Sequence, residues 1–473
     1  MKRRRNTKIV ATISNLHCNP DFIKKLYTAG IDVVRLNTAH MTHDDALEVI
    51  ENTRKVSGKI GIIIDTKGPE IRTCDTEKPF KVEYEDCIRI KGDPSQKSTG
   101  NIIYTSYKHF VRDIPVGSSV LIDDGSIALA VMEKDEEYLY CYVENEGVIH
   151  GRKSINIPSI HVKLPALSEK DKAFIEFAAD NDVDFIAHSF VRSAKDVIAV
   201  QNILDKKKSG IKIIAKIEDS MGVENLNDIL DHAYGVMIAR GDLAVEIPTE
   251  QIPMIQKKII KVCIKRRKPV IVATQMLHSM ITSPRPTRAE VSDVANACLD
   301  HADALMLSGE TASGKYPEIA VRTMGEIADE VEAEQSSFID TPYTLENKVT
   351  AYLAKSAVKA VLRLNTKAIV ADSVTGASIL ALSAYRGDNP IYAQVYDKRV
   401  MRQLSLSFGV HADYILPEIT SVLPLRKAIC RLIEDNRFKP DDLIIILAGH
   451  FGANQGASFI EISTAGNLME KCV

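Results

Sequence analysis

The sequence lacks several features that would indicate a membrane protein, a secreted protein or a protein built around a structural metal site. In its 473 residues no apolar run approaches the roughly 20 residues that a helix needs to span a membrane, and Met1–Arg5 is not followed by the apolar core of a signal peptide. The eight cysteines are dispersed, without a Cys-x-x-Cys pair or a His-rich metal spacing. We therefore expect a cytoplasmic protein with reduced structural thiols and no membrane partner.

Common nucleotide-binding motifs and the features of nucleic-acid-binding proteins are also missing. No Gly-x-Gly-x-x-Gly follows a strand pattern and no Gly-Lys-Ser/Thr phosphate loop occurs, so the Rossmann and Walker classes are not supported. The net charge is -3 and aromatic residues make up only 6% of the chain. The basic stretch at 257–268 lies near the carboxyl end of a predicted helix, where cations suit the helix dipole. Nucleic-acid binding is therefore not expected.

What the sequence does contain is one unit repeated eight times: a short β-rich run, a polar residue at its end, and an amphipathic helix. Helical patterns separate the runs, for example at 20–29, 43–56 and 168–181. Eight such units predict a (β/α)8 TIM barrel, in which the strand ends converge on one face. The runs are Lys8–Ile13, Val33–Asn37, Ile60–Asp65, Phe185–Ser189, Ile213–Glu218, Gly235–Asp242, Pro269–Thr274 and Ala304–Ser308.

The barrel repeat is interrupted between its third and fourth strand runs, which lie about 120 residues apart. Residues 71–156 contain short alternating strands with turn signals, a pattern typical of a small closed β-barrel. An insert after a barrel strand lies over the catalytic face, where it could act as a lid that excludes water. We therefore predict a catalytic barrel at 1–70 and 157–334, with an inserted β-barrel lid domain at 71–156.

The pattern changes again after Glu334, into helices and strands that predict a C-terminal α/β open-sheet domain at 345–473. Within it, the segment 373–378 follows a strand and opens a helix. Its residues Ser373, Thr375, Gly376 and Ser378 could hold the phosphate of an allosteric effector. A plain helix N-cap explains the same residues, and the sequence leaves both interpretations open.

Charge gathers at the ends of two neighbouring strand runs. A strand buried on both faces should be apolar, so Lys216, Glu218 and Asp242 need metal or substrate to offset their desolvation. Lys216 can hold an anion, while the two carboxylates offer the hard oxygen ligands that Mg2+ prefers. The alternative is a buried Lys-Glu structural pair. The barrel would gather these strand-end residues around one pocket: Arg35, Asn37, Asp65, Lys67, Ser189, Lys216, Glu218, Arg240, Asp242, Thr274, Ser308 and Glu310.

Seven segments, in their number, order and spacing, resemble the pyruvate kinase family. They are Asp65–Arg72, Leu164–Asp171, Ile214–Glu218, Ala239–Leu243, Ala273–Leu277, Pro284–Ala297 and Met306–Thr311. The resemblance extends from near the first residue to near the last. It implies a homotetramer that transfers the phosphoryl group of phosphoenolpyruvate to ADP, the final step of glycolysis, with Mg2+ (or Mn2+) and K+ as cofactors.

The resemblance also implies roles for individual residues. Glu218 and Asp242 would hold Mg2+, and Lys216 would stabilise charge on the transferring phosphoryl group and on the enolate. A hydroxyl alone is a poor acid, so solvent is an alternative donor of the proton that the enolate receives. The other assignments are Arg35 and Arg72 for the phosphoryl oxygens; Gly241, Asp242 and Thr274 for the substrate carboxylate; Thr274, Ser308 and Glu310 for the proton relay; and Arg35, Asn37, His40 and Lys153 for the nucleotide, which would bring a second Mg2+.

The monovalent-cation site is where the chain departs from the family pattern. The family has Arg-x-Asn-Phe-Ser-His, whereas this chain has Arg35-Leu-Asn-Thr-Ala-His40, so Ala39 cannot supply the serine hydroxyl that ligates K+. Glu70 is the residue associated with K+-dependent members of the family. The other expected ligands are present, namely Asn37, Asp65 and Thr66. We therefore predict that K+ activates the protein, with a water molecule in place of the missing oxygen. The loss of the serine hydroxyl at Ala39 can weaken the affinity for K+.

Other departures bear on nucleotide binding and regulation. Ser14–Leu16 replaces a Gly-Pro-Ala/Ser turn near the nucleotide, His278 replaces a common Glu, and Gly449–Gly456 lacks the usual Pro and Thr-Asn ending. Two other functions stay open. One is a different phosphoenolpyruvate or keto-acid barrel enzyme, which would not need the inserted domain; the other is a metabolite sensor without catalysis. The presence of the predicted catalytic residues argues against both.

Overall fold

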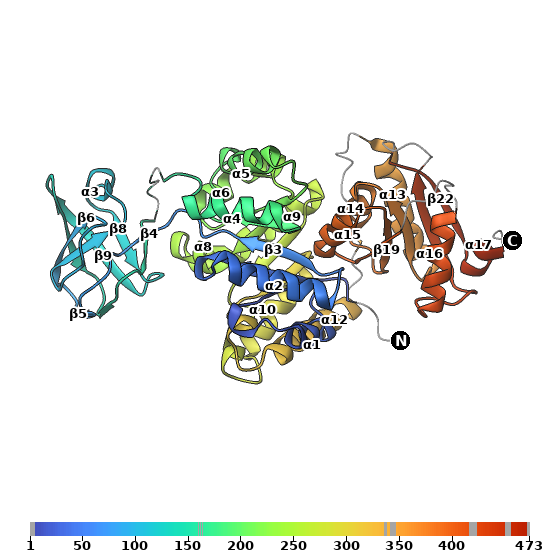
Figure 1. Cartoon of the computed structure of the whole chain (residues 1–473), viewed down its shortest axis with the longest axis horizontal. Helices are drawn as coiled ribbons and strands as arrows, with labels where there is room; N and C mark the ends of the chain where they lie inside the picture. Colours follow the sequence, from blue (N-terminus) through green and yellow to red (C-terminus); the bar gives the residue numbers. More distant parts are fainter. Residues whose placement is uncertain are drawn as a thin grey trace.

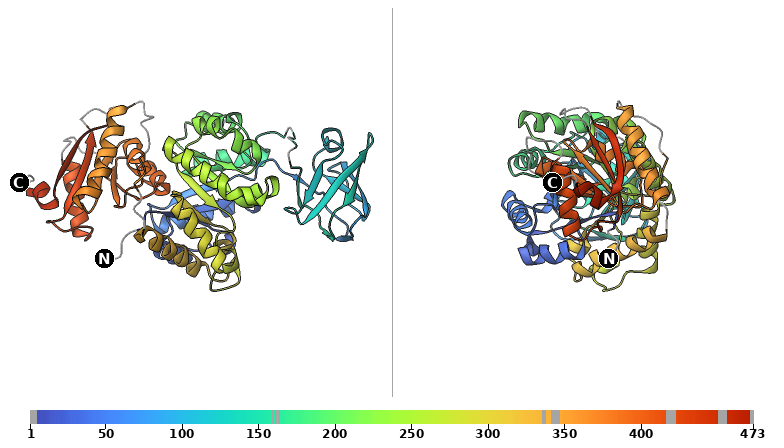
Figure 2. Two further views of the ribbon diagram at one scale, coloured as in Figure 1. Left: turned by 180° about the vertical axis from the view of Figure 1, so that it is seen from behind. Right: turned by 90° about the vertical axis from the view of Figure 1, so that its right-hand side faces the viewer.

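The computed structural model describes residues 5–158, 160, 162, 164–334, 338–340, 347–415, 423–449 and 456–470. The predicted start of the C-terminal domain at 345 and residues 450–455 lie outside these ranges. Figure 1 shows three bodies in a row, with the barrel between the inserted strands and the C-terminal α/β part, and Figure 2 shows the same arrangement from behind. Within the described ranges, no helix combines the length and the apolar composition needed to cross a membrane.

The central body is a closed barrel of eight parallel strands, as the repeat in the sequence predicted. Every barrel strand is short and almost wholly buried, which explains why the strand runs are rich in Val, Ile and Ala. Around the barrel the strand order is β1-β17-β16-β15-β14-β13-β3-β2. The bounds are β1 Lys8–Thr12, β2 Val33–Asn37, β3 Gly61–Asp65, β13 Phe185–His188, β14 Lys212–Ile217, β15 Gly235–Ala239, β16 Val270–Ala273 and β17 Ala304–Leu307.

The helices of the barrel begin where the sequence supplies N-caps. Helices α2, α4 and α10 each begin with a capping box. The side chain of the Ser or Thr before the helix accepts from the backbone N–H of the third helical residue, and the acidic side chain of that third residue accepts from the backbone N–H of the Ser or Thr. One strand prediction was too long, because β15 ends at Ala239 and residues Arg240–Glu246 form a short helix, α8. The longer helices are α1 Pro20–Ala29, α2 His43–Val56, α4 Glu169–Asp180, α5 Ala194–Lys206, α7 Leu226–His232, α9 Ile252–Arg266, α10 Arg288–Leu299 and α12 Pro317–Glu334; the short ones are α6 Ser220–Glu224 and α11 Gly309–Ala312.

The inserted segment is a strongly curled sheet of seven strands, in the order β4-β12-β8-β9-β10-β6-β7. Its two edge strands meet through a single antiparallel bridge between Thr73 and Thr105, so the sheet nearly closes. A separate core of Ile, Val and Leu side chains fills its interior. The bounds are β4 Ile71–Arg72, β6 Cys87–Gly92, β7 Ile102–Thr105, β8 Ser119–Ile122, β9 Ile127–Lys134, β10 Leu139–Val143 and β12 Ser154–Asn156, with a small pair β5 Phe80–Val82 and β11 Gly147–Ile149 and one helix, α3 Phe110–Asp113.

The C-terminal part is a five-stranded open sheet in the order β20-β19-β18-β21-β22, with only β22 antiparallel. Helices flank this sheet, as Figure 1 shows. The predicted α/β open sheet is confirmed. The bounds are α13 Lys348–Leu364, β18 Ile369–Ser373, α14 Ala377–Ala384, β19 Ile391–Val395, α15 Lys398–Gln403, β20 Val410–Tyr414, α16 Leu423–Glu434, β21 Leu443–Gly449, β22 Ala457–Thr464 and α17 Ala465–Glu470.

The C-terminal part closes the amino-terminal end of the barrel. Leu406, fully buried, belongs to the same apolar cluster as the side chains inside the barrel. Arg386 forms a buried ion pair with Asp303, which precedes β17, with an Nη2 to Oδ2 distance of 2.6 Å. Arg402 pairs at 2.6 Å with Asp184, which precedes β13. The opposite end of the barrel, where the strands finish, is therefore left for the inserted sheet and the site.

Candidate active site

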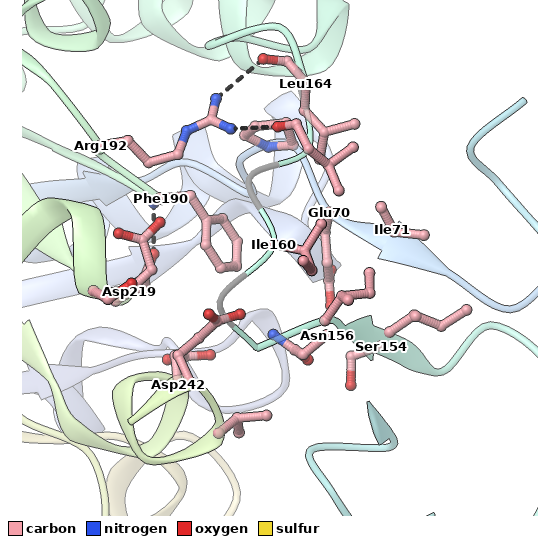
Figure 3. A pocket seen from close by; sticks show the side chains of 18 of the residues that line it. Glu70, Ile71, Ser154, Asn156, Ile160, Leu164, Phe190, Arg192, Asp219 and Asp242 are labelled. Carbon is pink, nitrogen blue, oxygen red and sulfur yellow. Dashed lines mark hydrogen bonds between the residues drawn. The ribbon is translucent and has the colours of Figure 1, made fainter. Parts of the chain in front are cut away.

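A cavity lies between the carboxyl ends of the barrel strands and the inserted sheet (Figure 3). The barrel contributes acidic side chains, among them Glu218, Asp219 and Asp242, and the inserted sheet contributes Asp124 and residues of β12. Figure 3 shows Asp219 and Asp242 on one side of this space and Ile71 and Ser154 on the other. The site thus belongs to two parts of the chain that are far apart in sequence.

Lys216, on β14, is the centre of the polar cluster at the strand ends. Its Nζ lies 2.8 Å from Ser189 Oγ, 2.9 Å from Glu218 Oε1 and 3.1 Å from Asp65 Oδ1. An ammonium group has three N–H donors, so these contacts use all of them. Burial alone would lower the pKa of Lys216, but Asp65 and Glu218 outweigh it and raise that pKa. The lysine is therefore held charged in a buried position.

Asp65, at the end of β3, joins Lys216 to Arg35 of β2. Its Oδ2 accepts from Arg35 Nε at 2.6 Å, and Arg35 also donates to the Thr12 hydroxyl at 3.0 Å. Burial would raise the pKa of Asp65, yet the two neighbouring cations lower it. Asp65 consequently stays ionised and fixes the positions of two cations that face the same end of the barrel.

The pKa values of Glu218 and Asp242 shift in the opposite direction to the pKa of Asp65. Burial raises the pKa of both, their mutual repulsion adds to the shift of Glu218, and Lys216 compensates only in part. The backbone N–H of Phe190 donates to Glu218 Oε2 at 2.6 Å. Two buried carboxylates that lack sufficient positive charge form a fitting pair of hard ligands for a divalent cation. Among the described residues, no group of three or more His, Cys, Asp or Glu is arranged to hold a metal.

Thr274 and Gly241 are brought together where β16 ends and α8 begins. The Thr274 hydroxyl accepts from the Gly241 N–H at 2.7 Å and donates to the Ala273 carbonyl at 2.6 Å. Thr274 has φ of +69°, a strained conformation for a β-branched residue and one that recurs at functional sites. Arg240 instead points toward α10, where it forms a two-pronged ion pair with Asp293 at 2.6 and 2.7 Å. Arg240 therefore joins the start of α8 to α10 and does not point into the pocket.

Ser308 and Glu310 follow β17, but their polar contacts are with backbone. The buried Glu310 carboxylate accepts from the Ser308 N–H at 2.7 Å and from the Leu277 N–H at 3.2 Å. These bonds tie the end of β17 to the segment after β16. They account for both oxygens of Glu310, so in this structure the carboxylate holds the backbone of these two segments together.

Three of the residues expected at the phosphoryl group and nucleotide lie apart from the Lys216 cluster. Arg72, on β4 of the insert, donates to Glu70 at 2.7 Å and to the Arg152 carbonyl at 2.6 Å. Lys153 pairs with Asp123 at 3.0 Å, also within the insert. His40 is exposed on the short turn after β2. Arg35 alone of the expected anion-binding cations is in contact with the cluster.

The residues expected to bind K+ meet at the ends of β2 and β3. Asn37 and Asp65 are register partners on these strands, and the Asn37 side chain accepts from the Ala39 N–H at 3.2 Å. The Thr66 hydroxyl accepts from the Ser189 N–H at 3.1 Å. Amide, carboxylate, carbonyl and hydroxyl oxygens are suitable ligands for a hard cation, so the residues present fit one. The side chain of Ala39 adds no oxygen.

The segment expected to hold an effector phosphate is folded into a local turn. Ser373 Oγ accepts from the Gly376 N–H at 2.9 Å, and Ser378 Oγ donates to the Asp372 carbonyl at 3.3 Å. Gly376 has φ of +84°, which a glycine adopts without strain. The Thr375 hydroxyl lies 3.5 Å from the Ala377 N–H. Local hydrogen bonds within the turn account for these hydroxyls.

Several residues of the site could not be singled out from sequence. Ser189 appeared only among many strand-end residues, yet it contacts Lys216 directly. Asp124 comes from the insert, and its charge raises the pKa of Asp242. Glu246, on α8, lines the cavity, and burial together with Asp219 raises its pKa to about 7. Asp124 and Glu246 lie in ordinary polar patterns, so only the folded chain identifies them.

Comparison with known proteins gives one consistent result. Residues 4–321 match the family model for the pyruvate kinase barrel domain, and residues 352–463 match the model for the pyruvate kinase alpha/beta domain. A pyruvate kinase from Borreliella burgdorferi is 45% identical over 470 residues, covering 98% of each chain. One from Staphylococcus epidermidis is 40% identical over 477 residues, covering 99% of this chain and 82% of the relative. A crystal structure of a pyruvate kinase from Cryptosporidium parvum superposes with a TM-score of 0.91 at 34% identity, covering 98% of this chain and 96% of that one.

Proposed function

The chain belongs to the pyruvate kinase family and transfers the phosphoryl group of phosphoenolpyruvate to ADP, and from this premise we propose which of its side chains carry the reaction. Lys216 is the cation that faces the transferred group and the developing enolate. The observation that supports this most is the convergence of its Nζ on Glu218 at 2.9 Å beside Asp242. Phosphoryl transfer depends mainly on positioning and charge stabilisation, which a fixed buried ammonium provides.

Glu218 and Asp242 are the residues that would hold the divalent cation, Mg2+ or Mn2+. When bound, such an ion neutralises charge on the phosphate and carboxylate oxygens of phosphoenolpyruvate. The raised pKa of both carboxyls supports this assignment, because positive charge in the site would relieve the cost of their burial. Mg2+ is commonly bound by one or two carboxylates together with substrate oxygens, which suits this pair.

The substrate is oriented by groups around the same strand ends. We assign Arg35 and Arg72 to the phosphoryl oxygens, since planar guanidinium groups match phosphate edges. Arg35 is already held by Asp65, whereas Arg72 reaches the substrate only if the insert moves toward the barrel and Glu70 is exchanged for phosphate. That movement is the lid closure expected of an inserted domain over a barrel face.

The carboxylate of phosphoenolpyruvate is assigned to the amides of Gly241 and Asp242 and to the Thr274 hydroxyl. The Gly241 N–H at present donates to Thr274, and an incoming carboxylate would take over this donor. Thr274 then stands beside the carbon that receives a proton, with Ser308 and Glu310 behind it. Because a hydroxyl is a weak acid, the proton itself comes from solvent linked to these groups.

The nucleotide and K+ sites complete the assignment. Arg35, Asn37, His40 and Lys153 bind ADP, which brings a second Mg2+. Asn37, Asp65 and Thr66 bind K+, with a water molecule where the family has a serine hydroxyl. The meeting of Asn37 and Asp65 at the ends of paired strands supports this K+ site.

Assembly and regulation follow the family plan in our proposal. The chain forms a homotetramer, acts in the cytoplasm, and binds a phosphorylated effector at 373–378. Among the described residues, β22 pairs on one side only, with β21, and exposes Phe459 and Ile462. An edge strand with exposed apolar side chains favours pairing with another copy of the chain.

A coupled assay of pyruvate formation from phosphoenolpyruvate and ADP tests these assignments. Mg2+ and K+ are each omitted in turn, and the variant Glu218→Gln/Asp242→Asn is assayed beside the unaltered chain. We expect activity that requires Mg2+, rises with K+ and is lost in the double variant. Undiminished product from the double variant would contradict the assignment of the metal ligands. If the unaltered chain forms no pyruvate at saturating phosphoenolpyruvate, catalysis itself is contradicted.

A further inference from the structure

Ser189 occupies a position that the assignments above leave without a role. It follows β13 directly and is only 2% exposed. Its hydroxyl accepts from Lys216 Nζ at 2.8 Å, and it is the one neutral group among the three that surround this ammonium in the described structure. We propose that Ser189 is a positioning residue that holds Lys216 in the orientation required for phosphoryl transfer.

The hydroxyl of Ser189 has a defined direction. It has a single proton, and the Thr66 carbonyl oxygen lies 2.6 Å away, closer than Asp65 Oδ1 at 3.3 Å. The proton therefore goes to Thr66, and a lone pair of the oxygen faces Lys216. The Ser189 N–H donates to the Thr66 hydroxyl at 3.1 Å, so two hydrogen bonds join residue 189 to residue 66.

Close packing fixes the backbone on the same side. Gly68 has φ of +73°, and a Cβ at that position would lie 2.8 Å from the Ser189 Cβ. The segment after β3 therefore passes as close to Ser189 as a glycine permits. Since the Ser189 Cβ cannot move toward this segment, its hydroxyl offers Lys216 a third contact in addition to the carboxylates of Asp65, on β3, and Glu218, which follows β14.

A neutral third contact has a particular consequence for the ammonium group. With only Asp65 and Glu218, the lysine could rotate toward either carboxylate, and an N–H would be left without a partner in a buried site. The Ser189 oxygen satisfies that N–H without adding negative charge, which the transferred phosphate would repel. Loss of this oxygen should therefore change the orientation of the Lys216 ammonium group more than it changes the affinity of the enzyme for substrate.

The proposal for Ser189 rests on the role assigned to Lys216, and the experiment tests these two assignments separately. Full-length variants Ser189→Ala, Ser189→Thr, Lys216→Met and the double variant Ser189→Ala/Lys216→Met are assayed with Mg2+ and K+ present. Ser383→Ala is the matched control, because Ser383 is a buried serine that donates to the Phe408 carbonyl at 2.8 Å in the C-terminal part. Activity per folded molecule, KM for phosphoenolpyruvate, and Tm are measured for each.

We expect Ser189→Ala to lower kcat on the order of 10- to 100-fold, as a small misplacement of a catalytic group does, while KM changes much less. Ser189→Thr keeps the hydroxyl but adds a methyl group at a closely packed position, so it should recover part of the loss, and Ser383→Ala should lower Tm alone. In the Lys216→Met background, Ser189→Ala should add no further loss, because the serine acts through the lysine.

Two results would overturn the inference. One is a kcat for Ser189→Ala equal to that of Ser383→Ala; the other is the same fold-loss with and without Lys216. If Lys216→Met itself keeps full activity, the role of the lysine fails instead. Should Ser189→Ala not fold, Ser189→Cys, which keeps the size but exchanges the hydroxyl for a weak hydrogen-bonding thiol, is compared with Ser189→Thr under the same criteria.

Discussion

Replacement of Lys216 by methionine separates what this residue does for catalysis from what it does for stability. Methionine keeps the volume and the apolar stem but removes the ammonium that lies 2.9 Å from Glu218 and 3.1 Å from Asp65. Loss of a comparable positioned cation lowers phosphoryl-transfer rates by roughly 10³ to 10⁵, which corresponds to about 4–7 kcal/mol of transition-state stabilisation. We therefore expect kcat to fall by that factor.

The cost in stability follows from the same contacts. Asp65 keeps Arg35 at 2.6 Å, but the buried Glu218 carboxylate keeps only the hydrogen bond that the Phe190 N–H donates to it within the described residues. Breaking a buried ion pair by removing one partner costs about 3–5 kcal/mol. The second change Glu218→Gln removes the stranded charge, so Lys216→Met/Glu218→Gln should regain most of the unfolding free energy and none of the activity.

Urea unfolding and the coupled pyruvate assay measure the two effects. Lys268→Met is the matched control, because Lys268 is partly buried at the opposite end of the barrel, where it donates to the Ala233 carbonyl at 2.7 Å. This variant should lose some stability and keep its kcat. The reasoning would be refuted by Lys216→Met retaining more than about a tenth of the activity, since a tenfold loss is only ~1.4 kcal/mol.

Three further predictions follow from the contacts already described. Because Glu218 and Asp242 have raised pKa values, the metal-free folded chain holds more protons than the unfolded chain, so its Tm should fall as pH rises from about 4.5 toward 7, the raised pKa of Glu218. Mg2+ should reverse this fall, and an equal fall in Glu218→Gln/Asp242→Asn would contradict it. Ala39→Ser should lower the K+ concentration that gives half-maximal activity, whereas equal turnover with and without K+ in the unaltered chain would remove the K+ site. Leu406→Ala should destabilise the barrel by about 2–5 kcal/mol although Leu406 belongs to the C-terminal part, and hydrogen exchange that rises only in that part would refute this.

Much of the architecture could be predicted because it depends on local pattern. The strand β2 occupies the predicted range Val33–Asn37, and helices α1 and α2 occupy the predicted 20–29 and 43–56. Buried parallel strands require apolar runs, and helix starts require caps, so both leave a record in neighbouring residues. The strand expected at Gly235–Asp242 was wrong after Ala239, because Arg240–Glu246 turns into α8, whose ion pair with Asp293 lies far along the chain.

The site was predictable to the extent that charge in an apolar context marks it. Lys216, Glu218 and Asp242 could be selected because buried strand ends do not carry charge without a reason. The contact of Ser189 with Lys216 could not be selected in this way, since a serine at a strand end is common and its partner is 27 residues away. The same holds for Asp124, which reaches the pocket from the inserted sheet.

The sequence by itself determined that this chain has eight barrel units, an insert, a C-terminal sheet, and a lysine with two carboxylates at neighbouring strand ends. Only the tertiary structure decided the direction in which the pKa of each of three carboxyl groups shifts: Arg35 and Lys216 lower the pKa of Asp65, whereas burial raises the pKa of Glu218 and of Asp242. It also decided that Leu406 closes the barrel from another domain. The physical reason is that composition and periodicity are local, while desolvation and Coulomb energy depend on distances between residues that the chain brings together only when it folds.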